Sequence, residues 1–149
     1  MGIVVNRPMV QPTFAELLDQ LDVQPQPPLR SIPTCEGGPV EGSRGFLLHT
    51  AEWHDSSTLR VTEAVSLTAS LDVLREVAAG RGPASCLLAL GYAGWGAGQL
   101  ERELQSNAWL SVDINQQIVF DDEYETKWRR ALASLGVDPT ALSGAVGHA

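Results

Sequence analysis

The residues with the clearest potential for recognition lie in a glycine-rich segment at residues 91–110. An apolar run at residues 86–90 leads into a loop with four glycines between positions 91 and 98, and a helix is expected to follow. Glycine at this density indicates backbone at positive φ or backbone pressed close to another group. Because the same loop carries two large aromatic side chains, Tyr92 and Trp95, it predicts a binding surface.

A strand, a glycine loop and a helix in this order can form a phosphate site. The spacing of Gly94, Gly96 and Gly98 matches neither the dinucleotide fingerprint nor the P-loop, and no lysine follows. Glu101 and Glu103 occupy the first turns of the expected helix, where they would repel a phosphate. Two alternatives stay open: a tight turn that packs its aromatic residues on a sheet, and a contact with an uncharged ligand or a protein.

Acid–base or metal chemistry would centre on the three histidines, His49, His54 and His148. His49 follows an apolar run and is expected to be a half-buried histidine with satisfied hydrogen bonds. It is also the acid or base of the alternative function, an enzyme acting on a small neutral substrate. The spacing of His49 and His54 matches no familiar zinc pattern, so no metal and no cofactor is expected. His148, one residue from the end of the chain, is expected to be mobile.

The two cysteines are far apart in the sequence and fit a reducing cytoplasm better than a disulfide framework. Cys86 lies in an apolar run and is expected in the core, whereas the polar surroundings of Cys35 favour an exposed position. The spacing of Cys35, Glu36 and His49 gives no support to a nucleophilic set. The preferred interpretation therefore assigns no catalytic residue.

Composition and charge limit the partners. The chain has 149 residues, of which 44% are hydrophobic, and a formal net charge of -8, which together indicate one globular domain over residues 1–149. No basic patch is visible, so direct binding to nucleic acid or to an anionic membrane is not expected. No apolar run approaches the roughly 20 residues that span a bilayer, and no signal peptide is seen. We expect a cytoplasmic protein.

The hydrophobic pattern predicts an α+β fold. A capping box formed by Thr13 and Glu16 should begin the first helix. Strands are expected at residues 2–6, 45–50, 59–61, 64–68, 85–90, 109–112 and 117–120, and helices at residues 14–21, 70–79, 99–106 and 121–135. The last helix should bury a stripe of Tyr124, Trp128, Ala131, Leu132 and Leu135. Because strands and helices do not alternate regularly, we expect a mixed, largely antiparallel sheet flanked by helices.

Several short motifs run in order along the chain. They are Val4-Val5-Asn6-Arg7-Pro8, Gly37-Gly38-Pro39-Val40, Arg44-Gly45-Phe46-Leu47-Leu48-His49, Gly91-Tyr92-Ala93-Gly94-Trp95, Gly98-Gln99-Leu100-Glu101, Asn107-Ala108-Trp109-Leu110, Leu135-Gly136-Val137-Asp138 and Gly147-His148-Ala149. Together they resemble the YqgE/AlgH family of bacterial proteins. The resemblance implies a cytosolic protein with a transcriptional-regulator label, linked to the regulation of alginate biosynthesis, and it supplies no catalytic residues to carry over.

The start of the chain departs from this family pattern. The resemblance implies an upstream segment with a Ser-Val-…-Cys-Glu-His stretch, so Met1 falls inside the pattern and we expect a domain truncated at its N-terminus. Residues 2–6 should then be an interior strand with an unpaired edge. Such an edge lowers stability and favours self-association, unless another copy or a loop covers it.

The preferred function is a non-enzymatic binding or regulatory module. Its partner is a protein or a small uncharged ligand, and any effect on transcription is indirect. The expected binding surface consists of Asn6, Arg7, Gly37, Gly38, His49, Tyr92, Trp95 and Gln99.

Overall fold

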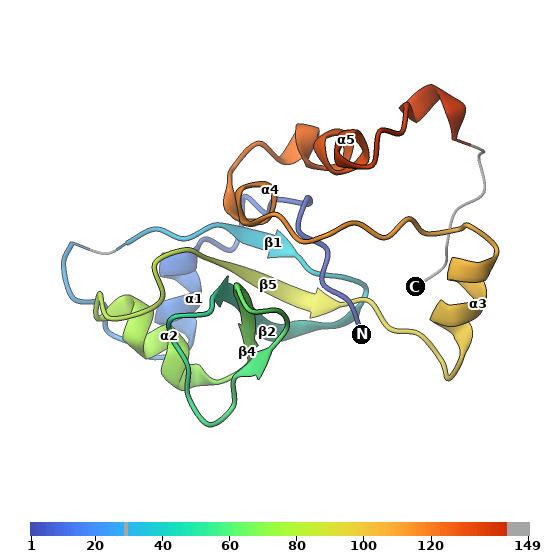
Figure 1. Cartoon of the computed structure of the whole chain (residues 1–149). Coiled ribbons are helices and arrows are strands. Elements are labelled where there is room, and N and C mark those ends of the chain that lie inside the picture. The colour runs from blue at the N-terminus through green and yellow to red at the C-terminus, as the bar shows by residue number, and fades with distance from the viewer. Residues whose placement is uncertain (29, 143–149) are drawn as a thin grey trace.

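The chain folds around one five-stranded mixed sheet (Figure 1). A computed structural model describes residues 1–28 and 30–142, so His148 lies outside the described residues. The strands stand in the order β1 (Thr34–Glu36), β5 (Cys86–Tyr92), β2 (Val40–Thr50), β4 (Val65–Thr68) and β3 (Leu59–Arg60). Only β1 and β5 are parallel. The expected α+β class with a largely antiparallel sheet is therefore confirmed.

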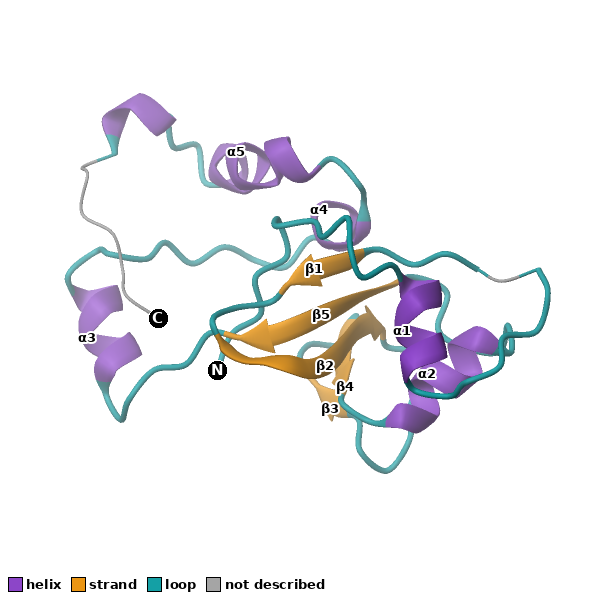
Figure 2. Ribbon diagram, turned by 180° about the vertical axis from the view of Figure 1, so that it is seen from behind, coloured by secondary structure: helices purple, strands orange, loops and turns teal. Residues whose placement is uncertain are grey.

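Two helices cover the first face of the sheet, as Figure 2 shows. The predicted capping box is present at α1 (Phe14–Gln20), where Glu16 N–H donates to Thr13 Oγ1 and Thr13 N–H donates back to Glu16. Ser70 caps α2 (Leu71–Ala78). The core on this face consists of Phe14, Leu18, Val23, Ile32, Leu47, Val73, Leu74, Val77, Ala78, Cys86 and Leu88. Both helices were predicted from the sequence at nearly these bounds.

The second face of the sheet is covered by the N-terminal segment and by α4 (Gln116–Phe120). Ile3 and Val5 pack on it from the first, and Val119 and Phe120 from the second. The buried residues beneath them are Cys35, Phe46, Leu48, Val65, Leu67, Leu87 and Ala89. The hollow described below lies on this face, beside Phe120. Within the described residues, no helix has the length and apolar composition needed to cross a membrane.

The expected regular strand at residues 2–6 is absent, which corrects the sequence analysis. The segment instead starts beside Ala93, just past the end of β5, and then runs along β1, with isolated bridges from Gly2 to Ala93 and from Pro8 to Cys35. Met9 N–H donates to Thr34 O at 2.8 Å, and Glu36 N–H donates to Arg7 O at 2.9 Å. Residues 7–9, not residues 2–6, lie opposite β1, and Pro8 among them has no backbone N–H to donate. The N-terminal segment therefore covers the outer edge of β1.

The prediction of strands at residues 109–112 and 117–120 was also wrong. Residues 110–115 form no helix or sheet, and residues 117–120 belong to α4. The β-branched run at 118–119 suggests a strand, but the Asn115 side chain accepts hydrogen bonds from Gln117 N–H and Ile118 N–H. That cap starts a helix, since it satisfies donors that a strand would have paired with a neighbour.

The last long helix, α5 (Tyr124–Ser134), buries only part of the predicted stripe: Leu132 is buried, and Tyr124 and Ala131 are half-buried. Trp128 is 53% exposed and Leu135 is exposed, whereas Lys127, the only lysine of the chain, is 2% exposed. Its Nζ donates to three carbonyl oxygens at the end of α4, those of Ile118 (2.6 Å), Val119 (2.9 Å) and Asp121 (2.7 Å). These carbonyls have no partner within such a short helix, so Lys127 acts as its C-terminal cap. A 3₁₀ turn at Pro139–Ala141 follows α5.

Replacing Lys127 by Met should destabilise the protein by roughly 2–4 kcal/mol, because the buried carbonyls and the Asp121 carboxylate lose their donor. Chemical denaturation followed by circular dichroism measures this loss. The control is Arg129→Met, an exposed position on the same helix that should change stability by less than about 0.5 kcal/mol. Equal stability of the two variants would contradict the capping role.

Candidate functional site

The glycines of the predicted surface lie at a backbone crossing. The chain leaves β1, passes the end of β5 within three residues and enters β2 on the other side. Gly37 and Gly38 are buried, and a Cβ at either position would collide with the backbone of Gly91 or Tyr92. Gly91 itself has φ 74°. Their role is therefore close approach of backbone, one of the two roles that glycine density suggests.

Beyond this crossing the chain forms a projection, residues 94–110, which we call the tryptophan arm. Its helix, α3 (Gln99–Gln105), has no buried residue, and Figures 1 and 2 show it standing apart from the sheet. The Glu103 carboxylate holds the arm together by accepting from Trp95 Nε1 (3.2 Å), Trp109 Nε1 (2.5 Å) and Gln99 Nε2 (3.0 Å). The two indole rings meet edge to face at 5.8 Å. The arm is thus an ordered aromatic projection.

The base of the arm gathers most of the predicted residues. The Trp95 ring lies over Gly2, and Tyr92 packs edge to face on Phe46 at 5.8 Å. Asn6 is exposed, and Arg7 is exposed and lies 3.8 Å from Glu36. The structure therefore places Asn6, Arg7, Gly37, Gly38, Tyr92, Trp95 and Gln99 at or near one end of the sheet. The sequence analysis missed Glu103 and Trp109, and the signal that it overlooked is an acid on α3 between two tryptophans.

His49 lies at the other end of β2 and is fully buried rather than half-buried. Its Nδ1 lies 2.9 Å from Thr50 O, and its Nε2 lies 2.9 Å from Thr68 Oγ1. Because a carbonyl oxygen only accepts, Nδ1 donates to Thr50 O. Thr58 Oγ1 lies 2.7 Å from Thr68 Oγ1 and bonds Asp55 in turn. His49 is separate from the tryptophan arm.

Both cysteines are buried free thiols. Burial raises the pKa of Cys86 and the pKa of Cys35 to about 11 each. The expectation of an exposed Cys35 was wrong, because the N-terminal segment covers it and its Sγ lies 3.3 Å from Val4 O. A thiol with so high a pKa is protonated at neutral pH and is a weak nucleophile.

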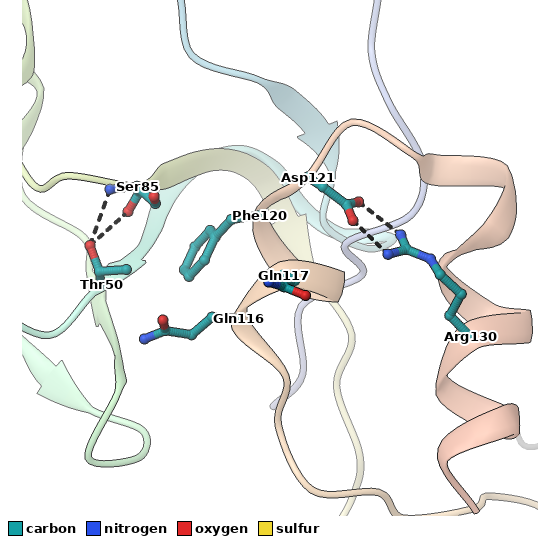
Figure 3. Close-up of a pocket in the computed structure, with 7 residues that line it drawn as sticks. All are labelled: Thr50, Ser85, Gln116, Gln117, Phe120, Asp121 and Arg130. Carbon is teal, nitrogen blue, oxygen red and sulfur yellow. Dashed lines mark hydrogen bonds and ion pairs between the residues drawn. The ribbon is translucent and has the colours of Figure 1, made fainter. Parts of the chain in front are cut away.

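A hollow of about 490 Å³ opens where α4 meets the ends of β2 and β5 (Figure 3). Its lining residues are Thr50, Ser85, Gln116, Gln117, Phe120, Asp121 and Arg130. The Phe120 side chain lies between two bonded pairs, Thr50 with Ser85 and Asp121 with Arg130. Sequence reasoning missed this hollow, because residues 117–120 were expected to be a strand.

The charges around this hollow are paired. Asp121 accepts from Arg130 Nη1 at 2.6 Å and from Nη2 at 2.9 Å. These bonds, with those of Lys127, lower the pKa of Asp121 to about 2. The volume of the hollow lies in the range of small-molecule sites. Its amide and hydroxyl groups lie beside one aromatic ring, and this lining suits an uncharged polar ligand. Within the described residues, no group of three or more His, Cys, Asp or Glu side chains is arranged to hold a metal.

The fold and the site together define the class of protein: an α+β protein with an open mixed sheet and an aromatic arm. The chain belongs to the AlgH-like family, whose sequence model matches residues 1–140. It is 47% identical to UPF0301 proteins of Jannaschia sp. and Rhodospirillum rubrum, covering 100% of this chain and 79% and 78% of those relatives. It also matches the solution structure of the AlgH protein from Pseudomonas aeruginosa, with TM-score 0.77 and 45% identity over 100% of this chain and 79% of that one.

Asp121 should make stability depend on pH in the acid range. Its folded pKa lies below its unfolded value of about 3.9, so its contribution is complete above that value and is lost as pH falls toward 2. In Asp121→Asn, the free energy of unfolding should therefore fall less steeply between about pH 4 and pH 2. Denaturant titrations at each pH measure the slope. Asp122→Asn, an exposed neighbour, should keep the wild-type slope, and an unchanged slope in Asp121→Asn would contradict the assignment.

Proposed function

We propose that the protein is a non-enzymatic binding and regulatory module that recognises a protein partner through the tryptophan arm and its base. One observation carries the proposal: a single carboxylate, that of Glu103, orders two tryptophans and Gln99 on a helix that buries nothing. Tryptophan dominates the energetics of protein interfaces because it buries a large area with few rotatable bonds. An ordered arm also loses little conformational entropy on binding.

The surface of the arm supports a protein partner. Trp109 is 37% exposed and Leu110 is 47% exposed, and Leu104 is exposed beside them. Asn6 and Arg7 are exposed near its base and supply polar contacts at the margin. An apolar centre with a polar rim is the usual anatomy of a protein interface.

The chemistry of the remaining candidates favours binding over catalysis. Both thiols are buried and have a raised pKa, and both ring nitrogens of His49 are engaged. A net charge of -8 disfavours direct contact with DNA, so we place any effect on transcription in a protein-mediated step. The free, buried cysteines are compatible with the reducing cytoplasm, where we place the protein.

Replacing Trp95 by Ala should abolish function while the fold is retained. The test is complementation in cells that lack the gene, scored on the phenotype of the deletion, with folding checked by circular dichroism. Trp128→Ala is the matched control, because Trp128 is exposed on α5 and outside the arm. Full rescue by a folded Trp95→Ala protein would show that the arm is not the functional surface.

A second candidate is binding, or turnover, of a small neutral molecule in the hollow beside α4. The observation in its favour is that Thr50 lines the hollow while its carbonyl holds His49 Nδ1. For His49 to act as an acid or base on a neutral substrate there, its ring would have to release Thr50 O and reach the hollow, because a carbonyl oxygen has no proton to transfer. Incubation with a broad metabolite mixture tests it. Turnover that disappears in a folded His49→Gln variant would support the enzyme, and turnover that persists in that variant would exclude His49 as its acid or base.

A further inference from the structure

Residues 110–114 combine exposed apolar side chains with an unpaired backbone. Leu110, Val112 and Ile114 are 47%, 42% and 41% exposed, and Ser111 and Asp113 alternate with them. The segment connects α3 to α4 as a long open trace (Figures 1 and 2). No backbone hydrogen bond joins it to any other described residue. This alternation with period two is that of a strand with one apolar face, and its donors and acceptors are available for a partner strand.

We infer that residues 110–114 pair with the same segment of a second copy, as antiparallel strands related by a twofold axis at Val112. The inference shares Leu110 with the tryptophan arm, but it does not rest on the proposed function, because it uses neither Trp95 nor the hollow. Strand addition of this kind supplies main-chain hydrogen bonds for affinity and alternate side chains for specificity.

The sequence of the segment selects this register. With the axis at Val112, Leu110 lies opposite Ile114 of the partner subunit, and the two Val112 side chains face each other. All six apolar side chains then share one face. On the other face, the Ser111 hydroxyl lies opposite the carboxylate of Asp113 of the partner subunit and can donate to it. An axis at Asp113 would set two carboxylates directly opposite each other, which is destabilising, and an axis at Ser111 would leave Ile114 without a partner.

Both outer edges of the five-stranded sheet are poor sites for pairing with another strand. The N-terminal segment occupies the outer edge of β1 through Arg7 and Met9. The opposite edge, β3, has two residues, one of which is Arg60, and short charged edges resist pairing. Self-association through an exposed edge therefore moves from residues 2–6, where the sequence analysis placed it, to residues 110–114.

The small area of this contact and the net charge of each copy determine the strength of the association and its dependence on salt. Five residues from each copy bury less than the roughly 1,200–2,000 Å² of a stable interface, so the association is weak and concentration-dependent. Each copy carries a formal charge of -8, so the copies repel at low ionic strength. Salt screens this repulsion and should strengthen the dimer, opposite to the response of an interface that depends on ion pairs.

Sedimentation velocity of the 149-residue chain, over a range of protein concentrations at low and high salt, tests the association. The wild type should shift from monomer toward dimer as concentration and salt rise. Val112→Lys places two like charges at the axis and should weaken the dimer at least about tenfold. Val10→Lys is the matched control, because it adds the same charge at a side chain that is 87% exposed elsewhere. A wild type that stays monomeric, or two variants that behave alike, would overturn the inference.

A cysteine scan tests the register. Val112→Cys should form a disulfide-linked dimer under mild oxidation, since facing Cα atoms in antiparallel strands lie about 4.5–5.5 Å apart, within disulfide reach. Leu110→Cys should not, because its counterpart in the partner subunit lies at the far end of the segment. The native thiols are buried and should contribute no background. Cross-linking that is as efficient at 110 as at 112 would overturn the twofold register.

Discussion

The backbone of the turn between β1 and β2 lies directly on the backbone at the end of β5, and the second face of the sheet is built around this crossing. β5 stands between β1 and β2, so three residues must carry the chain from one side of it to the other. Gly37 N–H donates to Leu90 O at 2.7 Å, and Val4 N–H donates to Gly37 O at 2.8 Å. The crossing thereby fixes the N-terminal segment and the point where the tryptophan arm leaves the sheet. A Cβ at Gly37 or Gly38 would push the turn between β1 and β2 away from the end of β5. The N-terminal segment and the start of the tryptophan arm would be displaced with it.

Lys127 supplies the second constraint, at the opposite side of the same face. By capping α4 it joins α5 to the apolar cluster that α4 covers, and it brings Asp121 to Arg130 at the rim of the hollow. Burying an ammonium group is costly unless every proton finds an acceptor, and here three carbonyls and a carboxylate oxygen are within reach. The lysine stabilises α4 because short helices leave their carbonyls unpaired.

Local patterns in the sequence predicted the parts of the fold that depend on neighbouring residues. The capping box at Thr13, the helix after Ser70 and the strands β2, β4 and β5 follow from periodicity and caps, and all are present. The errors have both local and long-range causes. Lys127 took the inward position expected of Trp128 through contacts six to nine residues away, and Asn115 caps a helix where a strand was expected. The N-terminal segment buried Cys35, whose Sγ contacts Val4 O, 31 residues earlier in the chain. The hollow was missed because it forms only when that helix, α4, lies against Thr50 and Ser85.

The tryptophan arm shows how one half-buried carboxylate can order a segment that has no core of its own. α3 buries none of its described residues, and Trp95, Gln99 and Trp109 converge on its Glu103. An isolated helix of seven residues is unstable in water, so these side-chain bonds and the ring contact must hold it. The same bonds direct both indole N–H groups inward and leave ring edges and the following apolar residues outside. The polar groups of the arm are therefore used for its own order, and what it presents to a partner is shape and apolar area.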